Sequence, residues 1–298
     1  MSAVAVLGSG AMGSRIAVRL LERGHRVTVW NRTQATSEPV VASGARAVAT
    51  PAEAAADSDF VLTVLRDESA VADVIGSADG VAGGITSRSM LIDLTTVGPE
   101  FARERAQLVP DAIAVLEAPM VGSRAEAVAG ELRLLVGGDT ENVREAWQLL
   151  SDLGTPTHVG NLGAGAVGKL LVNASLFAVV TALGECAAFA AAAGWSEATT
   201  FEVLGLGALA EQAARRRSAM SERAFPPRFA LDLAAKDARL IRNSLPAGLH
   251  DGVLEAACQW LERAEQAGWA ESDYTAVLEH IQRDANDGRQ DDPAPSAV

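Results

Sequence analysis

The residues Gly8-Ser9-Gly10-Ala11-Met12-Gly13 follow directly after the apolar run Ala3 to Leu7. Glycines at these three positions allow a tight turn and let backbone N–H groups approach a phosphate closely. The segment 11–23 then has the pattern of a helix, whose N-terminus carries partial positive charge. Apolar strand, glycine turn and helix in this order predict a binding site for the pyrophosphate of a dinucleotide.

The next apolar run, Arg26 to Trp30, reads as a second strand and ends at Asn31-Arg32-Thr33. An NAD site usually has Asp or Glu here, which binds the ribose hydroxyls. A carboxylate would repel a 2′-phosphate, whereas a guanidinium such as that of Arg32 binds it through two hydrogen bonds. The sequence therefore predicts NADP(H) in preference to NAD(H), with Asn31, Arg32 and Thr33 at its adenosine end.

A second group of chemically capable residues lies in the segment Gly163 to Asn173. Lys169 and Asn173 are four residues apart, so on a helix they share one face. A lysine among so many apolar residues is partly desolvated, and it can donate a proton to a carbonyl oxygen while hydride reaches the carbon. Asn173 could orient the ammonium or hold the substrate. The three glycines before Lys169 leave room either for a ligand or for a closely packed backbone.

Alternating strands and helices must position these residues. Strands are expected at 2–7, 26–30, 60–64, 90–93, 113–116, 132–136 and 157–159, with helices between them. This alternation predicts a mostly parallel, doubly wound α/β sheet, and ligands of such sheets bind at the carboxyl ends of the strands. Beyond Gly163 the pattern is helical. We expect a Rossmann domain at 1–162, an all-α domain at 163–285 that begins with a long interdomain helix, and a disordered tail at 286–298.

The 298 residues contain 49% hydrophobic residues and carry a net charge of −13, which disfavours nucleic acid and anionic membranes as partners. The two cysteines and four histidines show no metal-site spacing, and no export signal is evident, so we expect a cytoplasmic protein without a metal. The apolar segment 173–194 is long enough to span a bilayer, but it is rich in alanine and contains Glu185. We interpret it as a long helix that is buried on most sides, either in the core of a large protein or in an oligomer interface.

An ordered set of motifs resembles the β-hydroxyacid dehydrogenase family, which includes the 3-hydroxyisobutyrate dehydrogenases. The matching segments are GSGAMG at 8–13, WNRT at 30–33, DLTTVGP at 93–99, EAPMVGSRAEAVAGEL at 117–132, GAGAVGKLLVN at 163–173 and FPPRFALDLAAKD at 225–237. WNRT and the form of the loop after Glu117 resemble most the NADPH-preferring glyoxylate/succinic semialdehyde reductase branch. The resemblance implies hydride transfer between NADPH and an aldehyde, a keto acid or the corresponding hydroxy acid.

The resemblance also implies a role for individual residues. Lys169 takes the position of the catalytic general acid/base, and Asn173 that of its helper. Thr96 lies near the nicotinamide, Leu65 lines the cofactor cleft, and Lys236 closes over the cofactor. The substrate contacts implied are Met120, Val121, Gly122, Ser123 and Phe229, with Gly122 and Ser123 binding a substrate carboxylate through backbone N–H and hydroxyl groups.

Val121 departs from this pattern because the family usually has a serine there. Losing a hydroxyl that binds a carboxylate removes about 1–3 kcal/mol of binding. We therefore expect a bulkier or less acidic carbonyl substrate than glyoxylate. Two alternatives stay open. An imine reductase shares the scaffold but generally replaces the lysine, because an iminium substrate should not face an ammonium. A non-catalytic NADP-binding protein would need neither Lys169 nor Asn173.

Overall fold

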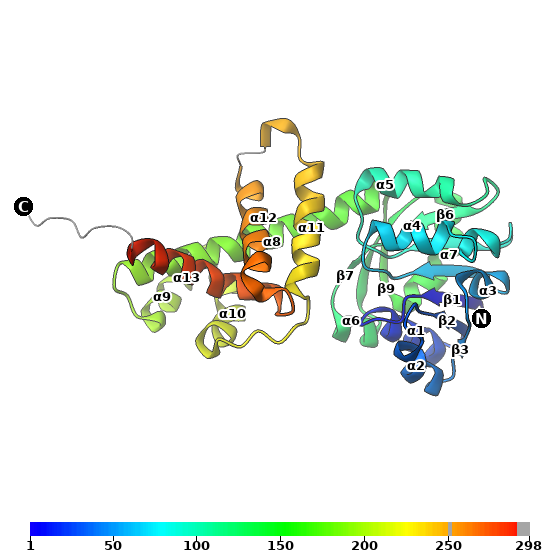
Figure 1. Cartoon of the computed structure of the whole chain (residues 1–298), viewed down its shortest axis with the longest axis horizontal. Coiled ribbons are helices and arrows are strands. Elements are labelled where there is room, and N and C mark those ends of the chain that lie inside the picture. Colours follow the sequence, from blue (N-terminus) through cyan, green and yellow to red (C-terminus); the bar gives the residue numbers. More distant parts are fainter. Residues whose placement is uncertain (250–251, 291–298) are drawn as a thin grey trace, which may run out of the picture. The chain divides into compact units, whose positions relative to one another are not determined.

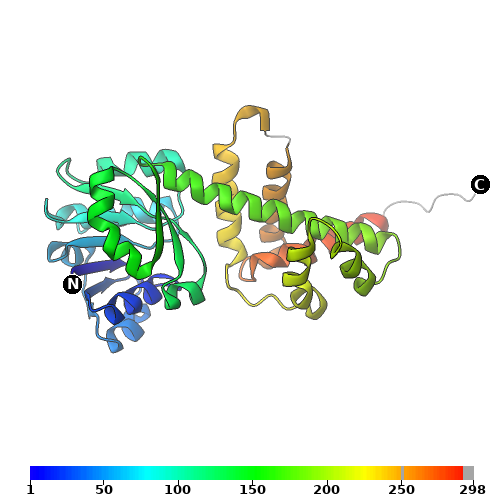
Figure 2. The same ribbon diagram turned by 180° about the vertical axis from the view of Figure 1, so that it is seen from behind.

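The computed structural model describes residues 1–249 and 252–290 of the chain (Figure 1). The chain divides into two compact units, Met1–Leu170 and Leu171–Val298. The dividing point falls inside one long helix, α8 (Ala164–Ala192), which Figure 2 shows as a continuous green ribbon. The first unit is an α/β domain and the second is helical, as the sequence predicts.

A nine-stranded sheet forms the centre of the first unit, in the order β3-β2-β1-β4-β5-β6-β8-β7, with β9 paired to β8. The strands are β1 (Ala3–Leu7), β2 (Arg26–Trp30), β3 (Arg46–Ala47), β4 (Phe60–Thr63), β5 (Met90–Asp93), β6 (Ala114–Glu117), β7 (Met120–Val121), β8 (Leu132–Gly137) and β9 (Gly154–Gly160). The six strands β3, β2, β1, β4, β5 and β6, which are adjacent in this order, run parallel to one another. Strand β8 runs antiparallel to β6 and β7.

Helices cover both faces of this sheet, which makes it doubly wound. One apolar cluster joins the sheet to α1 (Gly13–Glu22), α2 (Glu38–Ala42), α6 (Arg124–Ala129) and α7 (Thr140–Leu153). A second cluster on the other face includes α3 (Pro51–Ala56), α4 (Glu68–Gly76) and α5 (Pro99–Glu104). Alternate residues of one strand enter different clusters: Val4 and Val6 belong to the first, Ala5 and Leu7 to the second. This alternation explains why the strands are apolar throughout.

The expected strands are confirmed, with small shifts of their ends. The helix after the glycine turn begins at Gly13, since Ala11 and Met12 belong to the turn. Strand β9 begins at Gly154, three residues before the predicted start, because it pairs with β8 from Leu132 onward. The two-residue strands β3 and β7 were not predicted, because a pattern of alternation cannot be recognised in two residues.

The second unit contains the rest of α8 and helices α9 (Glu197–Leu204), α10 (Ala210–Glu222), α11 (Leu231–Ser244), α12 (Val253–Ala264) and α13 (Val277–Gln290). Its described residues contain no strand, only an isolated bridge between Ala230 and Asp273. A Cβ on Gly184 of α8 would lie 2.8 Å from Ile281, so the glycine lets α13 pack closely. The tail expected from residue 286 starts inside α13, and residues 291–298 lie outside the described part.

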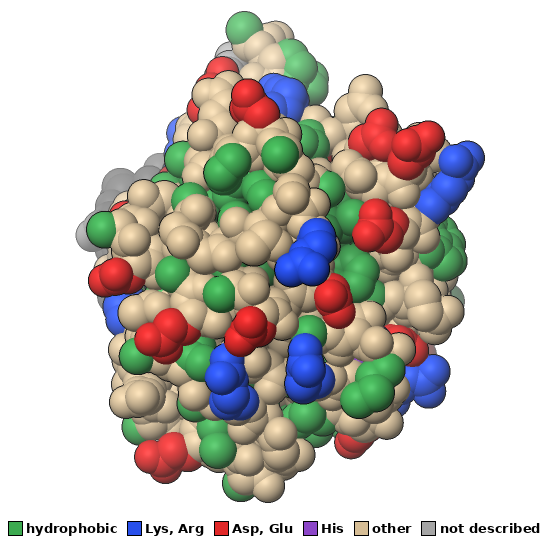
Figure 3. Space-filling model, turned by 90° about the vertical axis from the view of Figure 1, so that its right-hand side faces the viewer, with side chains coloured by type: hydrophobic (Ala, Val, Ile, Leu, Met, Phe, Trp, Pro, Cys, Tyr) green, Lys and Arg blue, Asp and Glu red, His purple; other side chains and the backbone are tan. Residues whose placement is uncertain are grey.

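Helix α8 is long and apolar enough to cross a membrane by length and composition alone. Within the second unit, however, Phe177, Val180 and Leu183 of this helix are buried in the helical core. Charged side chains of both signs are interspersed on the molecular face shown in Figure 3, so the net negative charge does not form one acidic surface there.

Candidate functional site

The three glycines of the first turn differ in what surrounds them. Gly8 has a φ of +102°, and a Cβ there would lie 2.3 Å from the Val64 carbonyl oxygen. A Cβ on Gly13 would lie 1.7 Å from the Gly8 carbonyl oxygen, so α1 can approach β1 only without a side chain. A Cβ on Gly10 would meet nothing within 4 Å. Gly8 and Gly13 thus serve the turn itself, whereas Gly10 leaves open space, as a pyrophosphate requires.

The end of β2 is tied to the glycine turn. The backbone N–H of Ser9 donates to Asn31 Oδ1 at 3.0 Å, and Asn31 Nδ2 donates to the Thr33 carbonyl at 2.9 Å. The Ser9 and Ser37 hydroxyls also bond at 2.7 Å. Arg32 is exposed, and no carboxylate pairs with it within residues 1–249 and 252–290. The predicted cofactor residues at 8–13 and 31–33 therefore meet in the first unit.

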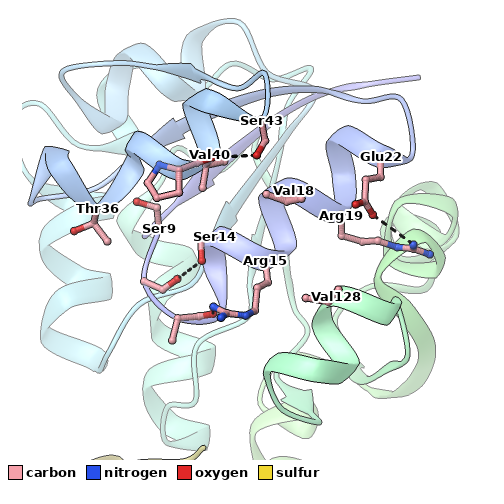
Figure 4. Close-up of a pocket in the computed structure, with 13 residues that line it drawn as sticks. Ser9, Ser14, Arg15, Val18, Arg19, Glu22, Thr36, Val40, Ser43 and Val128 are labelled. Atoms are coloured by element: carbon pink, nitrogen blue, oxygen red, sulfur yellow. Dashed lines mark hydrogen bonds and ion pairs between the residues drawn. The ribbon is translucent and has the colours of Figure 1, made fainter.

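A cavity of about 590 Å³ borders the glycine turn (Figure 4). Ser9, Ser14 and Arg15 line it on one side, and Thr36 and Val40 on another. The Arg15 guanidinium donates to the Ala11 carbonyl at 2.6 Å, which holds the cation beside the turn. The cavity thus combines the positive end of a helix, an arginine and an apolar wall.

Two further residues that the sequence predicts to contact the cofactor follow the ends of β4 and β5. Leu65 is half-buried, and its Cδ2 would lie 3.0 Å from a Cβ on Gly8, so it packs against the glycine turn. The backbone N–H of Leu65 donates to Thr95 Oγ1 at 3.1 Å. Thr95 is buried, and the predicted Thr96 beside it is half-buried. The structure therefore places Leu65 and Thr96 on neighbouring strand ends, linked by Thr95, which sequence reasoning missed.

The predicted substrate loop begins in β7, where Met120 and Val121 pair with Leu134 and Arg133 of β8. Gly122 follows with a φ of +130°. At Ser123, the backbone N–H and the hydroxyl both donate to Oε2 of Glu126, each at 2.7 Å. The two Ser123 donors expected to bind a substrate carboxylate are thus already bound by a carboxylate of this chain. The spacing Ser-x-x-Glu at a helix start was the signal for this contact.

The glycines before Lys169 pack against protein rather than opening a ligand space. A Cβ on Gly165 would lie 2.4 Å from the Leu135 carbonyl oxygen, and one on Gly168 would lie 3.2 Å from the Leu135 side chain. Of the two sequence alternatives, the closely packed backbone is therefore the one observed. Lys169 is half-buried on α8, one turn after Gly165.

In the second unit, Asn173 and Lys236 share a buried carboxylate. Asn173 is 3% exposed, and its Nδ2 donates to Asp237 Oδ2 at 2.7 Å. The Lys236 ammonium lies 2.8 Å from Asp237 Oδ1. Asp237 thus brings two predicted residues together. Sequence reasoning assigned it no role, although it ends the FPPRFALDLAAKD motif.

Phe229 belongs to an aromatic cluster in the same unit. Its ring centroid lies 6.5 Å from that of Phe177 and 5.6 Å from that of Tyr274. Phe177 follows Asn173 by four residues on α8, so the cluster continues the helix face of Asn173. The Arg216 guanidinium donates to the Tyr274 hydroxyl at 2.5 Å, and burial raises the pKa of that hydroxyl.

Comparisons with known proteins agree with the fold of this chain. The family model described as the NAD binding domain of 6-phosphogluconate dehydrogenase matches residues 3–165. A second model, described as NAD-binding of NADP-dependent 3-hydroxyisobutyrate dehydrogenase, matches residues 163–281. The chain is 30% identical to glyoxylate/succinic semialdehyde reductase 1 of Arabidopsis thaliana over 285 residues, covering 93% of this chain and 98% of the relative.

Two solved structures share the architecture. The 3-hydroxyisobutyrate dehydrogenase of Mycobacterium tuberculosis, solved with L-serine, has a TM-score of 0.83 at 25% identity, covering 95% of this chain and 99% of that one. A variant imine reductase from Myxococcus stipitatus, solved with NAD+, has a TM-score of 0.65 at 21% identity, covering 94% and 99%. The second likeness shows the fold alone.

Proposed function

The chain belongs to the β-hydroxyacid dehydrogenase family of NAD(P)-dependent oxidoreductases, and from that premise we propose that it reduces a carbonyl group with NADPH, using Lys169 as the general acid. The observation that carries the proposal is that both lysines of the chain lie at predicted site positions. Of 25 basic residues, 23 are arginine, and the two lysines are Lys169 and Lys236. Arginine cannot release its proton near neutral pH, whereas a lysine can. Every other basic side chain of this sequence is an arginine, so the two lysine ammonium groups occur only at positions of the predicted site.

The cofactor preference rests on Arg32, with Asn31 in the place of an acid. An exposed guanidinium without a carboxylate partner in the described structure is available to a 2′-phosphate. Replacing it by Arg32→Gln should raise the KM for NADPH by about tenfold or more, because charge-assisted hydrogen bonds are lost. The KM for NADH should change less than twofold. An equal rise for both cofactors would refute the phosphate role.

The proposed chemistry uses the side chains of α8. Bound NADPH supplies the hydride. The Lys169 ammonium donates a proton to the substrate oxygen as negative charge develops there. Asn173 donates its Nδ2–H to Asp237, which leaves the amide oxygen of Asn173 free to accept. We assign that oxygen the task of orienting the ammonium one turn earlier on the same helix face.

The substrate class follows from Ser123 and Val121. Both Ser123 donors are bound to Glu126, and Val121 adds apolar surface where the family pattern has a hydroxyl. A carboxylate entering this loop would meet the negative charge of Glu126. We therefore propose an aldehyde or ketone without a carboxylate next to the reacting carbon, and not glyoxylate, as the preferred substrate.

The decisive experiment is an NADPH-oxidation screen over neutral aldehydes, keto acids and cyclic imines, run with the wild type and with Lys169→Ala. A general acid contributes about 10²-fold or more to turnover, so Lys169→Ala should lose that factor for carbonyls while binding NADPH normally. Cyclic imines as the preferred substrates would favour the alternative chemistry instead. Carbonyl turnover unchanged by Lys169→Ala would end the assignment.

We also propose that the enzyme is a cytoplasmic homodimer or homotetramer formed through α8. Near its C-terminal end this helix exposes Phe189 to 76%, and the following residues expose Trp195 to 47% and Leu206 to 87%. An interface formed by this end of α8 would cover these apolar side chains. Light scattering at micromolar concentration should give a multiple of 30.9 kDa, and Phe189→Asp should lower it. A monomeric wild type would contradict the proposal.

A further inference from the structure

A row of buried polar side chains crosses the carboxyl ends of three neighbouring strands. Thr63, Asp93 and Glu117 are register partners on β4, β5 and β6. Their side chains are at most 1% exposed, and so is that of Arg105, which follows α5. Charged groups are almost never so deeply buried unless they are paired. Leu65, Thr96 and the substrate loop follow directly after these three strand ends.

Within this row the guanidinium is bonded mainly to one of the two carboxylates. Arg105 Nη1 donates to Asp93 Oδ2. The other Asp93 oxygen accepts the Thr63 hydroxyl at 2.7 Å and the Thr95 N–H at 2.9 Å. Glu117 Oε2 lies 3.7 Å from Arg105 Nη2, too far for a hydrogen bond. Arg105 therefore balances the charge of Glu117 without holding its carboxyl group in place.

The Glu117 carboxyl is held instead by the beginning of α8. Its Oε1 accepts the backbone N–H of Gly163 at 2.6 Å and that of Gly165 at 2.8 Å. The space for it depends on glycine, since a Cβ on Gly137 would lie 2.3 Å from Oε1 and one on Gly165 would lie 3.1 Å from Cδ. Burial raises the pKa of Glu117, although Arg105 and the N–H groups favour its ionised form.

This arrangement differs from an ordinary helix cap. A capping side chain normally comes from the residue just before the helix. Here it comes from a strand 46 residues earlier in the chain, so it ties the helix to the sheet. Gly165 contacts Glu117, and Lys169 follows Gly165 by four residues on the same face of α8. The first turn of α8 thus connects the buried row to the lysine.

We propose that Glu117 is a positioning residue, which fixes the first turn of α8 to the strand ends and thereby sets the place and the charge of Lys169. This inference rests on the proposed role of Lys169. A carboxylate suits the task because it attracts the helix N-terminus and the ammonium one turn further on. Within the buried row Glu117 faces Arg105 and its register partner Asp93, and the Arg103 guanidinium packs against Gly163 at the start of α8.

The test compares Glu117→Gln with a matched control. Gln keeps an oxygen that accepts from Gly163 and Gly165, and its amide nitrogen replaces an oxygen that has no hydrogen bond. The control is Asp139→Asn, which removes the charge of an exposed carboxylate that caps a different helix, α7, by accepting from the Glu141 N–H at 2.8 Å. Selective ¹³C labelling of lysine gives two side-chain signals in this chain, so the titration of Lys169 can be followed directly.

We expect Glu117→Gln to lower kcat by about tenfold or more and to leave the Kd for NADPH within about twofold. The Lys169 signal should titrate about one pH unit lower, because a nearby negative charge is lost. Amide exchange at 163–166 should accelerate, whereas the thermal midpoint should shift by less than about 5 °C, since burial already disfavours the charge of Glu117. Asp139→Asn should change none of the Lys169 readouts.

Two results would overturn the proposal. One is a folded Glu117→Gln variant with wild-type kcat and an unchanged Lys169 titration. The other is a loss of activity that follows the thermal midpoint equally in both variants, which indicates a merely structural role. Lys169→Ala in the same assay distinguishes a failure of the proposed function from a failure of the positioning role of Glu117. If Lys169→Ala is fully active, the proposed function fails; if Lys169→Ala is inactive and Glu117→Gln is unaffected, only the positioning role fails.

Discussion

Replacing Glu126 by glutamine should change which carbonyl compounds the enzyme prefers. In the structure, Oε2 of Glu126 accepts both the N–H and the hydroxyl of Ser123 at 2.7 Å. A substrate carboxylate that seeks these donors must displace a carboxylate and then remain beside it. Two unit charges 4 Å apart repel by about 4 kcal/mol at an effective dielectric constant of 20. Because Glu126 is half-buried, solvent screening reduces this to about 1.5–3 kcal/mol, or roughly 10- to 100-fold.

The assay measures kcat/KM with NADPH for an aldehyde that carries a carboxylate and for its methyl ester. Glu126→Gln should raise kcat/KM for the acid relative to kcat/KM for the ester by roughly 10- to 100-fold, mainly by lowering KM for the acid. Glu131→Gln is the matched control, because Glu131 is an exposed carboxylate five residues later and should leave the ratio within about twofold. If Glu126→Gln changes kcat/KM equally for both substrates, Glu126 does not select against a substrate carboxylate.

Three other predictions concern the glycine turn, the cysteines and a buried ion pair. Gly10→Ala should fold normally and bind NADPH at least tenfold more weakly, whereas Gly13→Ala should fail to fold, because its Cβ would overlap the Gly8 carbonyl; thermal melting and cofactor fluorescence distinguish the two. Burial raises the pKa of Cys258 to about 12, while Cys186 is exposed, so a thiol reagent at pH 8 should titrate one cysteine in the native protein and two after denaturation. Burial opposes the ionisation of Asp152, but hydrogen bonds from His25 and Arg23 outweigh it and hold the pKa of this carboxyl below 3.8. Its contribution to stability is therefore present above that value and lost as the pH falls below it, so Asp152→Asn should lower the free energy of unfolding at pH 7 by about 1–3 kcal/mol and have a smaller effect at pH 2.

The sequence predicted those parts of the molecule that depend on local pattern. The strands of the first unit, the glycine turn and the long helix follow from apolar runs and glycine spacing, and the structure confirms them. The contacts that organise the site depend on residues far apart in the chain. Glu117 meets Gly163 across 46 residues, and Asn173 meets Asp237 across 64. No spacing rule predicts such pairs, although both acids lie inside recognised motifs.

Arg105 best illustrates what could not be predicted from the sequence, because nothing in its sequence neighbourhood distinguishes it from the other 22 arginines. Only the fold reveals that its guanidinium lies between two buried carboxylates, those of Asp93 and Glu117. Both acids end neighbouring strands, and the proposed cofactor and substrate loops follow these strand ends. Removing one partner of a buried ion pair costs about 3–5 kcal/mol, and here it would leave two acids without compensation. Because Asp93 holds Thr95, and Glu117 holds the start of α8, that cost would fall together on the loop after β5 and on the helix that carries Lys169. The buried row of Thr63, Asp93, Glu117 and Arg105 therefore links the stability of the first unit to the positions of the proposed site residues.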